Sequence, residues 1–339
     1  MHLPQRNEPF FWMGEILATG LEEISNDPEK LKSPGFWSVS TTFEGEWSCA
    51  RWGQVQSSPF PDSRDGWQGI RTPWQSTQSR SEYIAYVEEI RRLISQGEVY
   101  QVNACREISA AISSHSLWPL MTHLLVENPS PYASFLKLPD IEIASSSPEL
   151  FLRIHDRDVT SAPIKGTKSA TESGIDFGKK DIAENIMIVD LIRNDLGRIS
   201  ETGSVDVPQL LATESHPGLS HLVSYVHGKL QSGVTWSQIA DALLPPGSVS
   251  GAPKSSAVEI IRKEEGRPRG PYCGALGWVN GDEALFSLAI RIFWSNRDGV
   301  LRFGTGAGIT WGSVAEEEWE ETELKARHLL GIAEKTFNV

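Results

Sequence analysis

The chain has 339 residues and a formal net charge of −13 at pH 7. An acidic balance of this size argues against a general nucleic-acid binder, which needs a basic face. Hydrophobic residues make up 39% and charged residues 22% of the chain, a composition that excludes disorder as the dominant state and predicts a core large enough to need no disulfide or metal support.

Cysteine usage and the lack of a long apolar segment indicate in which cellular compartment the protein works. Cys49, Cys105 and Cys273 are far apart and form no C-x-x-C pair. This pattern favours a reducing environment and argues against a cysteine-based zinc site. The first residues lack a basic region followed by an apolar run, and no stretch is long enough to cross a bilayer. We therefore expect a cytoplasmic protein with no membrane partner.

The predicted elements follow one another from a short N-terminal segment (residues 1–75) into a main body (residues 76–339). Residues 54–82 are rich in Ser, Pro, Gln and Arg and are typical of a linker. Hydrophobic periodicity and turn residues predict strands at 99–108, 132–138, 141–145, 149–154, 220–230, 274–280, 284–294 and 300–305. They predict helices from 81 to Gly97, at 178–194, from Pro253 onward and at 314–334.

Strand clusters separated by long helices are typical of a layered α+β fold. Ser313 and Glu316 have the spacing of a capping box, which predicts where the terminal helix begins.

Two predicted helices each carry a pair of carboxylates three residues apart. Glu318 and Glu321 are neighbours on one face of the terminal helix, and Asp181 and Glu184 are neighbours on the 178–194 helix. A solvated acidic face explains either pair alone. Together, two such helices could hold a divalent cation that prefers oxygen ligands, such as Mg²⁺.

Two glycine-rich segments are candidates for anion binding. The run from Gly304 to Ile309 follows a predicted strand, and the loop from Gly247 to Gly251 leads into a helix that starts at Pro253. Backbone N–H groups converge readily at such places, although an ordinary tight turn gives the same pattern. No helix opens directly on the first run, so it is not a dinucleotide-binding fingerprint.

Four further side chains could carry chemistry. Lys165 lies between Pro163 and Gly166, and becomes a nucleophile if it is desolvated, although most such lysines are surface charges. Glu149 starts an apolar strand, where burial would raise its pKa and suit a general acid. His221 precedes an apolar run and has the features of a structural histidine. Arg291 ends the apolar run from residue 285, where a guanidinium could bind a carboxylate.

Taken together, residues 80–332 resemble the chorismate-utilising enzymes, which include anthranilate synthase component I, aminodeoxychorismate synthase component I, and the isochorismate and salicylate synthases. Nine segments in order carry the resemblance: Tyr100–Asn103, Ser146–Glu149, Pro163–Thr167, Glu184 to Arg198, His221–Ser224, Gly251–Lys254, Tyr272–Gly274, Gly306–Ile309 and Glu321–Lys325. The resemblance implies antiparallel-rich sheets layered as a sandwich and flanked by helices.

Two positions point to one subgroup of this family. The resemblance implies that anthranilate synthases usually carry alanine at the position of Lys165. It implies that isochorismate and salicylate synthases carry a lysine, which acts as a base, at the position of Gln101. With Lys165 and Gln101 present, the chain is similar to aminodeoxychorismate synthase component I. The implied product is 4-amino-4-deoxychorismate, a precursor of 4-aminobenzoate and folate.

The resemblance also implies a role for each candidate residue. Lys165 would attack the ring, Glu149 would be the acid, and His221 would sit close by. Glu184 and Glu321 would bind Mg²⁺ directly, supported by Asp181 and Glu318. The remaining residues would bind chorismate, a dianion: Thr167, Tyr272, Arg291, Gly306, Ala307, Gly308 and Lys325.

Differences from the family pattern lead to expectations about substrate contacts, feedback regulation and the source of ammonia. Ala162 stands before Pro163 where an arginine is common, which affects local substrate contacts. The segment before residue 80 is short, so we expect no tryptophan feedback. No glutaminase segment is present, so we expect a separate glutamine amidotransferase subunit or the use of free ammonia. The rival interpretations are anthranilate synthase component I and a non-catalytic chorismate-binding subunit.

Overall fold

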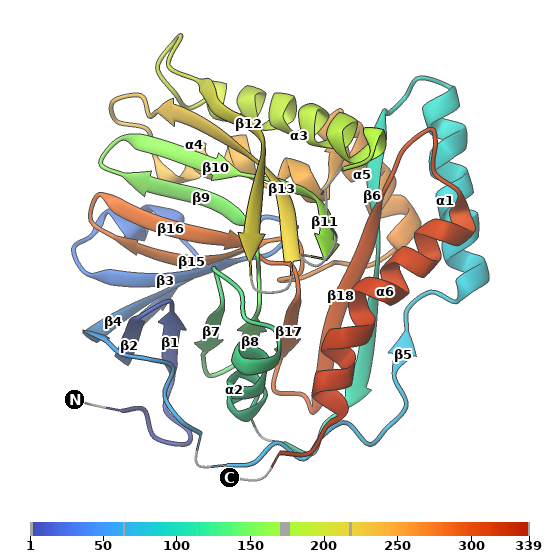
Figure 1. The fold of residues 1–339 in the computed structure, drawn as a ribbon. Coiled ribbons are helices and arrows are strands. Elements are labelled where there is room, and N and C mark those ends of the chain that lie inside the picture. Colours follow the sequence, from blue (N-terminus) through green and yellow to red (C-terminus); the bar gives the residue numbers. More distant parts are fainter. Residues whose placement is uncertain (1–2, 64, 115, 170–176, 217–218, 338–339) are drawn as a thin grey trace.

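The computed structural model describes residues 3–63, 65–114, 116–169, 177–216 and 219–337, which form helices around a long antiparallel sheet (Figure 1). The helices are α1 Arg80–Ser95, α2 Trp118–Glu127, α3 Lys179–Gly197, α4 Trp236–Leu243, α5 Lys254–Glu265 and α6 Ala315–Glu334, with 3₁₀ turns η1 Pro28–Lys32 and η2 Gly247–Val249. The strands are β1 Phe10–Met13, β2 Ile16–Ser25, β3 Phe36–Thr41, β4 Trp47–Ser57, β5 Gln75–Ser76, β6 Gln101–Ala111, β7 Ser134–Lys137, β8 Glu142–Ser145, β9 Leu150–His155, β10 Asp158–Ala162, β11 Ile164–Ser169, β12 Asp206–His216, β13 Leu219–Lys229, β14 Gly251–Ala252, β15 Ala275–Asn280, β16 Glu283–Leu288, β17 Ile292–Ser295 and β18 Val300–Ile309.

The strand pairings form one continuous antiparallel series. It runs β6–β18–β17–β8–β7–β1–β2–β4–β3–β15–β16–β9–β10–β13, with β14 added to β6 and with β11 and β12 added to β13. In Figure 1 the two ends of this series turn back toward each other below α3. The predicted α+β layering is confirmed.

The N-terminal strands belong to the same sheet as the rest of the chain. β1 pairs with β7, and β3 pairs with β15 over its whole length. All six residues of β3 are buried, because strands cover both of its edges and other elements cover its faces. The expected linker begins inside β4, and Trp67 is buried further along it.

Helix α1 shows how the sequence pattern specifies local structure. Ser79 is its N-cap, and the side chain of Glu82 accepts a hydrogen bond from the backbone of Ser79, which completes a capping box. The buried face carries Tyr83, Val87 and Ile90 at helical spacing. This face packs on the main hydrophobic core, so α1 covers one side of the sheet beside α6 (Figure 1).

Three local predictions were wrong. The predicted 284–294 strand is two strands, because Arg291 has a φ of +53° that breaks the extended backbone. The Gly304–Ile309 run is part of β18 rather than a loop after it. Ser313 does not cap the terminal helix, because its Oγ accepts a hydrogen bond from the Thr310 N–H; α6 starts after Val314 without a side-chain cap.

The glycines of β18 let other groups approach its backbone. A Cβ built on Gly304 would lie 2.2 Å from the Tyr272 ring, and one built on Gly306 would lie 2.5 Å from Cys105 Sγ. We expect Gly304→Ala to lower the free energy of unfolding by about 1–3 kcal/mol, since the ring must move within a packed core. Urea denaturation measures this loss. Gly312→Ala, where a Cβ meets open space, should change stability by less than about 1 kcal/mol; equal losses would contradict the packing explanation.

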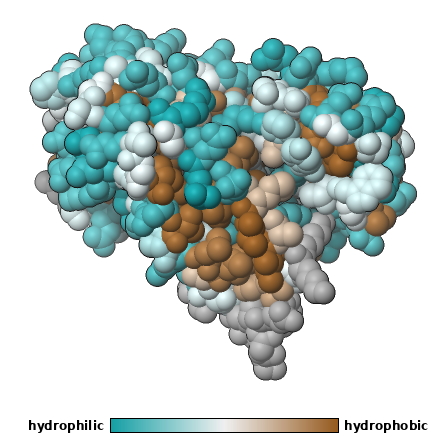
Figure 2. All heavy atoms as spheres, turned by 90° about the horizontal axis from the view of Figure 1, so that it is seen from above, coloured by the Kyte–Doolittle hydropathy of each residue, from teal (hydrophilic) through white to brown (hydrophobic). Residues whose placement is uncertain are grey.

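The surface is mainly hydrophilic. Figure 2 shows hydrophilic atoms around the periphery of one face and hydrophobic atoms gathered in its middle. Large exposed hydrophobic side chains include Tyr100, Ile186 and Trp311. Within the described residues, no helix is both long enough and apolar enough to span a membrane.

Candidate active site

Glu149 is a buried carboxyl at the head of β9, with only 6% of its surface exposed. Its Oε1 accepts a hydrogen bond of 2.9 Å from the hydroxyl of Ser248. Burial raises the pKa of Glu149 to about 7, against the opposing effects of Lys165, Ser248, the Ile164 N–H and Arg291. A carboxyl with this pKa is protonated in a substantial fraction of molecules near neutral pH, which general acid catalysis requires.

Lys165 lies beside this carboxyl. It is half-buried on β11, and its Nζ donates to the Ser248 carbonyl oxygen at 3.4 Å. In the strand ladder Lys165 is opposite Leu222, and Thr167 is opposite His221. The backbone pairing therefore brings Lys165, Thr167 and His221 to one place, and His221 is buried there. The side chain of Thr167 lies outside the described part of the structure.

Arg291 completes the charged group around Glu149. The prediction of a strand-borne guanidinium was wrong, because Arg291 occupies the turn between β16 and β17. Its side chain is partly buried, and burial lowers its pKa while the Glu149 carboxylate opposes that change. A cation in this position can bind an anionic ligand next to the acid.

The two carboxylates of α3 lie near two different strands, β18 and β11. Glu184 Oε2 lies 3.8 Å from the position that a Cβ on Gly308 would take. One turn earlier, the Asp181 side chain lies 3.2 Å from the corresponding position on Gly166, the residue after Lys165. Helix α3 thus runs from the lysine-bearing strand to the glycine-rich strand.

The carboxylates of α6 approach the same strand from another side. Glu321 Oε1 forms a 2.7 Å ion pair with Lys325 Nζ, which donates to the Gly306 carbonyl oxygen at 3.0 Å. Glu318 is buried one turn earlier on α6. Side chains from both helices therefore approach β18 at Gly306–Gly308, Glu184 directly and Glu321 through Lys325.

The backbone of this stretch turns some of its hydrogen-bonding groups away from β6. β17 pairs with β18 only at residues 302 and 303, so β18 continues beyond it. Opposite Gly306 and Gly308, the N–H groups of Cys105 and Asn103 donate to Glu265 and Ser250 rather than to β18. In an antiparallel ladder this alternation turns the Gly306 and Gly308 amides away from β6. They can donate to an anion at the outer edge.

The carboxylates near β18 could hold a magnesium ion whose other ligands are water and substrate oxygens. Among the described residues, no three His, Cys, Asp or Glu side chains form a ready-made cage. Mg²⁺ usually takes one or two carboxylates and fills its other positions with water and substrate oxygens. Glu184 and Glu321 are two such carboxylates. The side-chain amide of Gln101 lies beside Gly308, with its Nε2 2.6 Å from the position that a Cβ there would take.

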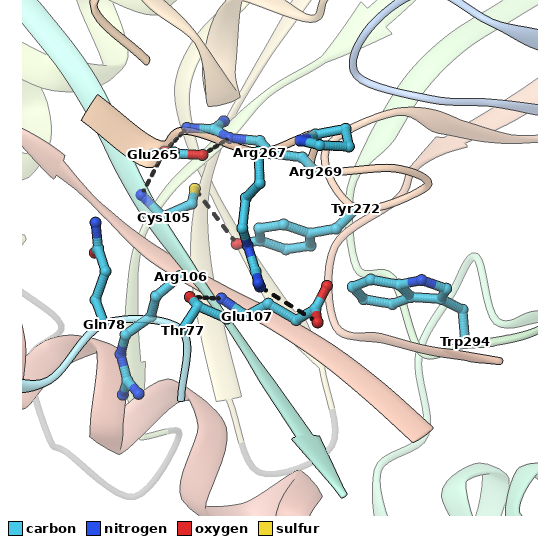
Figure 3. Close-up of a pocket in the computed structure, with 11 residues that line it drawn as sticks. Thr77, Gln78, Cys105, Arg106, Glu107, Glu265, Arg267, Arg269, Tyr272 and Trp294 are labelled. Carbon is cyan, nitrogen blue, oxygen red and sulfur yellow. Dashed lines mark hydrogen bonds and ion pairs between the residues drawn. The ribbon is translucent and has the colours of Figure 1, made fainter. Parts of the chain in front are cut away.

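Tyr272, expected to line the substrate site, lies in a small pocket beside β6 and β18. Its ring packs on Gly304, and its hydroxyl lies 4.0 Å from Cys105 Sγ, in the small pocket of Figure 3. Arg269 and Glu265, which also line this pocket, form a buried ion pair of 2.6 Å. Lys165, Glu149 and the carboxylates of α3 and α6 are not among the residues that line this pocket.

Sequence reasoning missed Ser248 as an individual residue. It lies in the loop from Gly247 to Gly251, which was singled out only as an anion-binding candidate. It also missed the buried ion pair between Lys254 Nζ and Asp195 Oδ2, which are 2.7 Å apart. A Ser-rich loop gives no signal that one hydroxyl contacts a carboxyl 99 residues away.

Comparison with known proteins decides the family. Residues 39–331 match the family described as chorismate binding enzyme. This chain belongs to the chorismate binding enzyme family. The match covers most of β3 to α6 and includes every candidate residue named above.

Relatives in this family carry two different names. The chain is 39% identical over 264 residues to "Anthranilate synthase component 1" of Methanothermobacter thermautotrophicus, covering 74% of this chain and 56% of that protein. It is 37% identical over 250 residues to "Aminodeoxychorismate synthase component 1" of Bacillus subtilis, covering 71% and 53%. The chain spans between about half and two thirds of the length of such relatives.

Solved structures show the same fold. A putative 2,3-dihydroxybenzoate-specific isochorismate synthase of Bacillus anthracis superposes with a TM-score of 0.80 at 21% identity, covering 97% of this chain and 96% of that one. Anthranilate synthase component I of Streptococcus pneumoniae gives 0.79 at 24% identity, covering 97% and 93%. The predicted family resemblance and fold are both confirmed.

Proposed function

We propose that this chorismate-binding chain is an aminodeoxychorismate synthase component I, which converts chorismate and ammonia to 4-amino-4-deoxychorismate. The observation that carries the proposal is the placement of Lys165 and Glu149 around Ser248. A primary amine and a protonated carboxyl held together supply the nucleophile and the acid for displacing a ring hydroxyl.

The proposed substrate is a dianion, and the chain offers local positive charge despite its acidic total. Arg291, Lys325 and the amides of Gly306 and Gly308 are the groups that would bind its carboxylates. Glu184 and Glu321 would hold Mg²⁺, with Asp181 and Glu318 supporting them. When bound, the ion would offset negative charge on the ring carboxylate as the hydroxyl departs.

The chemistry proceeds in two displacements. The Lys165 amine, after losing a proton, adds at C2 of the ring; the double bonds shift, and the C4–O bond breaks as Glu149 gives its proton to the leaving hydroxyl, so that water departs. Ammonia then adds at C4, and the C2–N bond to Lys165 breaks. The net change replaces the C4 hydroxyl by an amine and releases one water.

Ammonia would come from a separate subunit. The relatives are named as component 1 of their synthases, a name that implies a second component. We propose a glutamine amidotransferase in this role, with free ammonia as its substitute in vitro.

Anthranilate synthase component I is the second candidate, because relatives of that name are as similar as those named aminodeoxychorismate synthase. Incubation with chorismate, Mg²⁺ and ammonium distinguishes the two. We expect a product that becomes 4-aminobenzoate only after a lyase is added, and no turnover when a chelator replaces Mg²⁺. Direct release of fluorescent anthranilate would exclude our assignment, and chorismate binding without turnover would indicate a non-catalytic subunit.

A further inference from the structure

Ser248 touches both proposed reactive groups. Its hydroxyl donates to Glu149 Oε1 at 2.9 Å, and its carbonyl oxygen accepts from Lys165 Nζ at 3.4 Å. The residue is 8% exposed, so water does not compete freely for these bonds. One residue on a loop thus fixes the separation of two side chains that come from β9 and β11.

The loop that carries Ser248 is fastened to α3. Lys254, after the loop, pairs with Asp195 of α3 at 2.7 Å and donates to the Ala242 carbonyl, before the loop, at 3.3 Å. Gly247 packs so closely on α3 that a Cβ there would lie 2.6 Å from Leu191 Cδ2. The chain on both sides of Ser248 is therefore held to the helix.

A buried ion pair is a costly way to gain stability alone. Burial lowers the pKa of Lys254 and raises that of Asp195, the directions expected for charges removed from water. Apolar residues of similar size often stabilise such a position equally well, whereas an ion pair requires one geometry. The pair thus suits a role in alignment.

Resting on the proposed function, we propose that Ser248 is a positioning residue that aligns Glu149 with Lys165, and that the Asp195–Lys254 pair holds its loop in register with α3. Helix α3 also carries Glu184 about three turns earlier and Asp181 about four turns earlier. The pair therefore links the reactive side chains to the carboxylate near Gly308 of β18 and to the one near Gly166 of β11. Glu149, Lys165 and the β18 edge are then all positioned relative to one helix, α3.

The charged groups around Glu149 give the proposal a pH signature. Lys165 of β11 and Arg291 of the β16–β17 turn face it, and both favour its ionised form, as does the Ser248 hydroxyl. Ser248→Ala leaves both cations and removes only the hydroxyl. The pKa of Glu149 should then rise further by about one unit, since a hydrogen bond to the ionised form is lost.

The first test compares Ser248→Ala with Ser248→Thr and Ser255→Ala. For Ser248→Ala we expect kcat to fall about 10–100-fold, KM to change less than about threefold, and the basic limb of the pH–rate profile to move about one unit higher. Threonine should restore both, and Ser255, exposed on α5, is the matched control. A raised KM with unchanged kcat, or an unmoved limb, would overturn the positioning role.

The second test examines the ion pair. The double variant Asp195→Asn/Lys254→Met removes both charges and avoids leaving one buried alone; Lys263→Met, which breaks an exposed pair on α5, is its control. We expect the double variant to move the basic limb of the pH–rate profile as Ser248→Ala does. Adding Ser248→Ala to the double variant should lower kcat by less than a further factor of about three. Fully additive losses would refute the link.

An infrared titration of the Glu149 carboxyl, identified by its loss in Glu149→Gln, separates this inference from the proposed function. The carboxyl should titrate higher in Ser248→Ala whichever aromatic or aminated product the protein forms. If anthranilate is released and the shift is seen, the proposed function fails and the positioning role stands. If the shift is missing, the positioning role fails whatever the product.

Discussion

Lys165→Ala should abolish formation of 4-amino-4-deoxychorismate, with a loss of at least about 100-fold in kcat. Alanine removes the amine that we propose adds to the ring but leaves the Ser248 carbonyl, Glu149 and the β18 amides in place. Chorismate binding should therefore persist within about tenfold. Single-turnover assays with ammonium, coupled to a lyase, measure the loss.

Lys165→Arg distinguishes a nucleophile from a simple positive charge. Arginine keeps the charge near Glu149 but stays protonated and does not add to the ring. It should be as inactive as alanine, while Lys229→Ala, an exposed lysine on β13, should retain full activity. Full activity in either Lys165 variant would remove the nucleophile from the mechanism.

Glu149→Gln should lower kcat about 10²–10⁴-fold, because an amide of nearly the same shape has no acidic proton to give. In the unaltered protein, activity should decline as pH rises through about 7, since Glu149 then loses its proton. The small residual rate of the variant should not decline as pH rises through this range. pH–rate profiles of both proteins check the prediction, and Glu283→Gln, an exposed change on β16, serves as the control.

The same carboxyl should also affect stability. Its pKa is about 7 when folded and near 4.5 ordinarily. The folded state therefore holds this proton more tightly, and raising the pH from about 4.5 through 7 reduces stability. Glu149→Gln lacks this loss. Its free energy of unfolding, minus that of the unaltered protein, should therefore increase by about 3 kcal/mol as pH rises across that range. A difference that stays constant with pH would contradict the raised pKa.

The sequence predicted those parts of the fold that have strong local patterns. The helices α1, α3 and α6 and the strands β8, β9 and β15 were expected within a few residues of their observed bounds. The strands before residue 57 were missed, since β1 and β3 are short, fully buried runs that lack an alternating pattern. The 284–294 prediction failed because a single left-handed residue, Arg291, interrupts an otherwise apolar run.

For the candidate site, residue types were easier to predict than their neighbours. The buried state and raised pKa of Glu149 followed from its place at the head of an apolar strand. The placement of Tyr272 beside Cys105 did not, because contacts between distant segments have no local signature. The roles of Lys165, His221 and the four carboxylates remain predictions that rest on the family resemblance.

The strand order has a consequence for how the protein becomes active. Glu149 precedes β9 and Lys165 lies on β11, near one end of the series, whereas Gly306 lies on β18 near the other end and Lys325 lies on the last helix. Chains with many contacts between distant segments fold slowly, because large loops must close first. An incomplete chain leaving the ribosome would therefore lack the β18 edge that we propose binds the anion. We expect activity only after the final helix has docked.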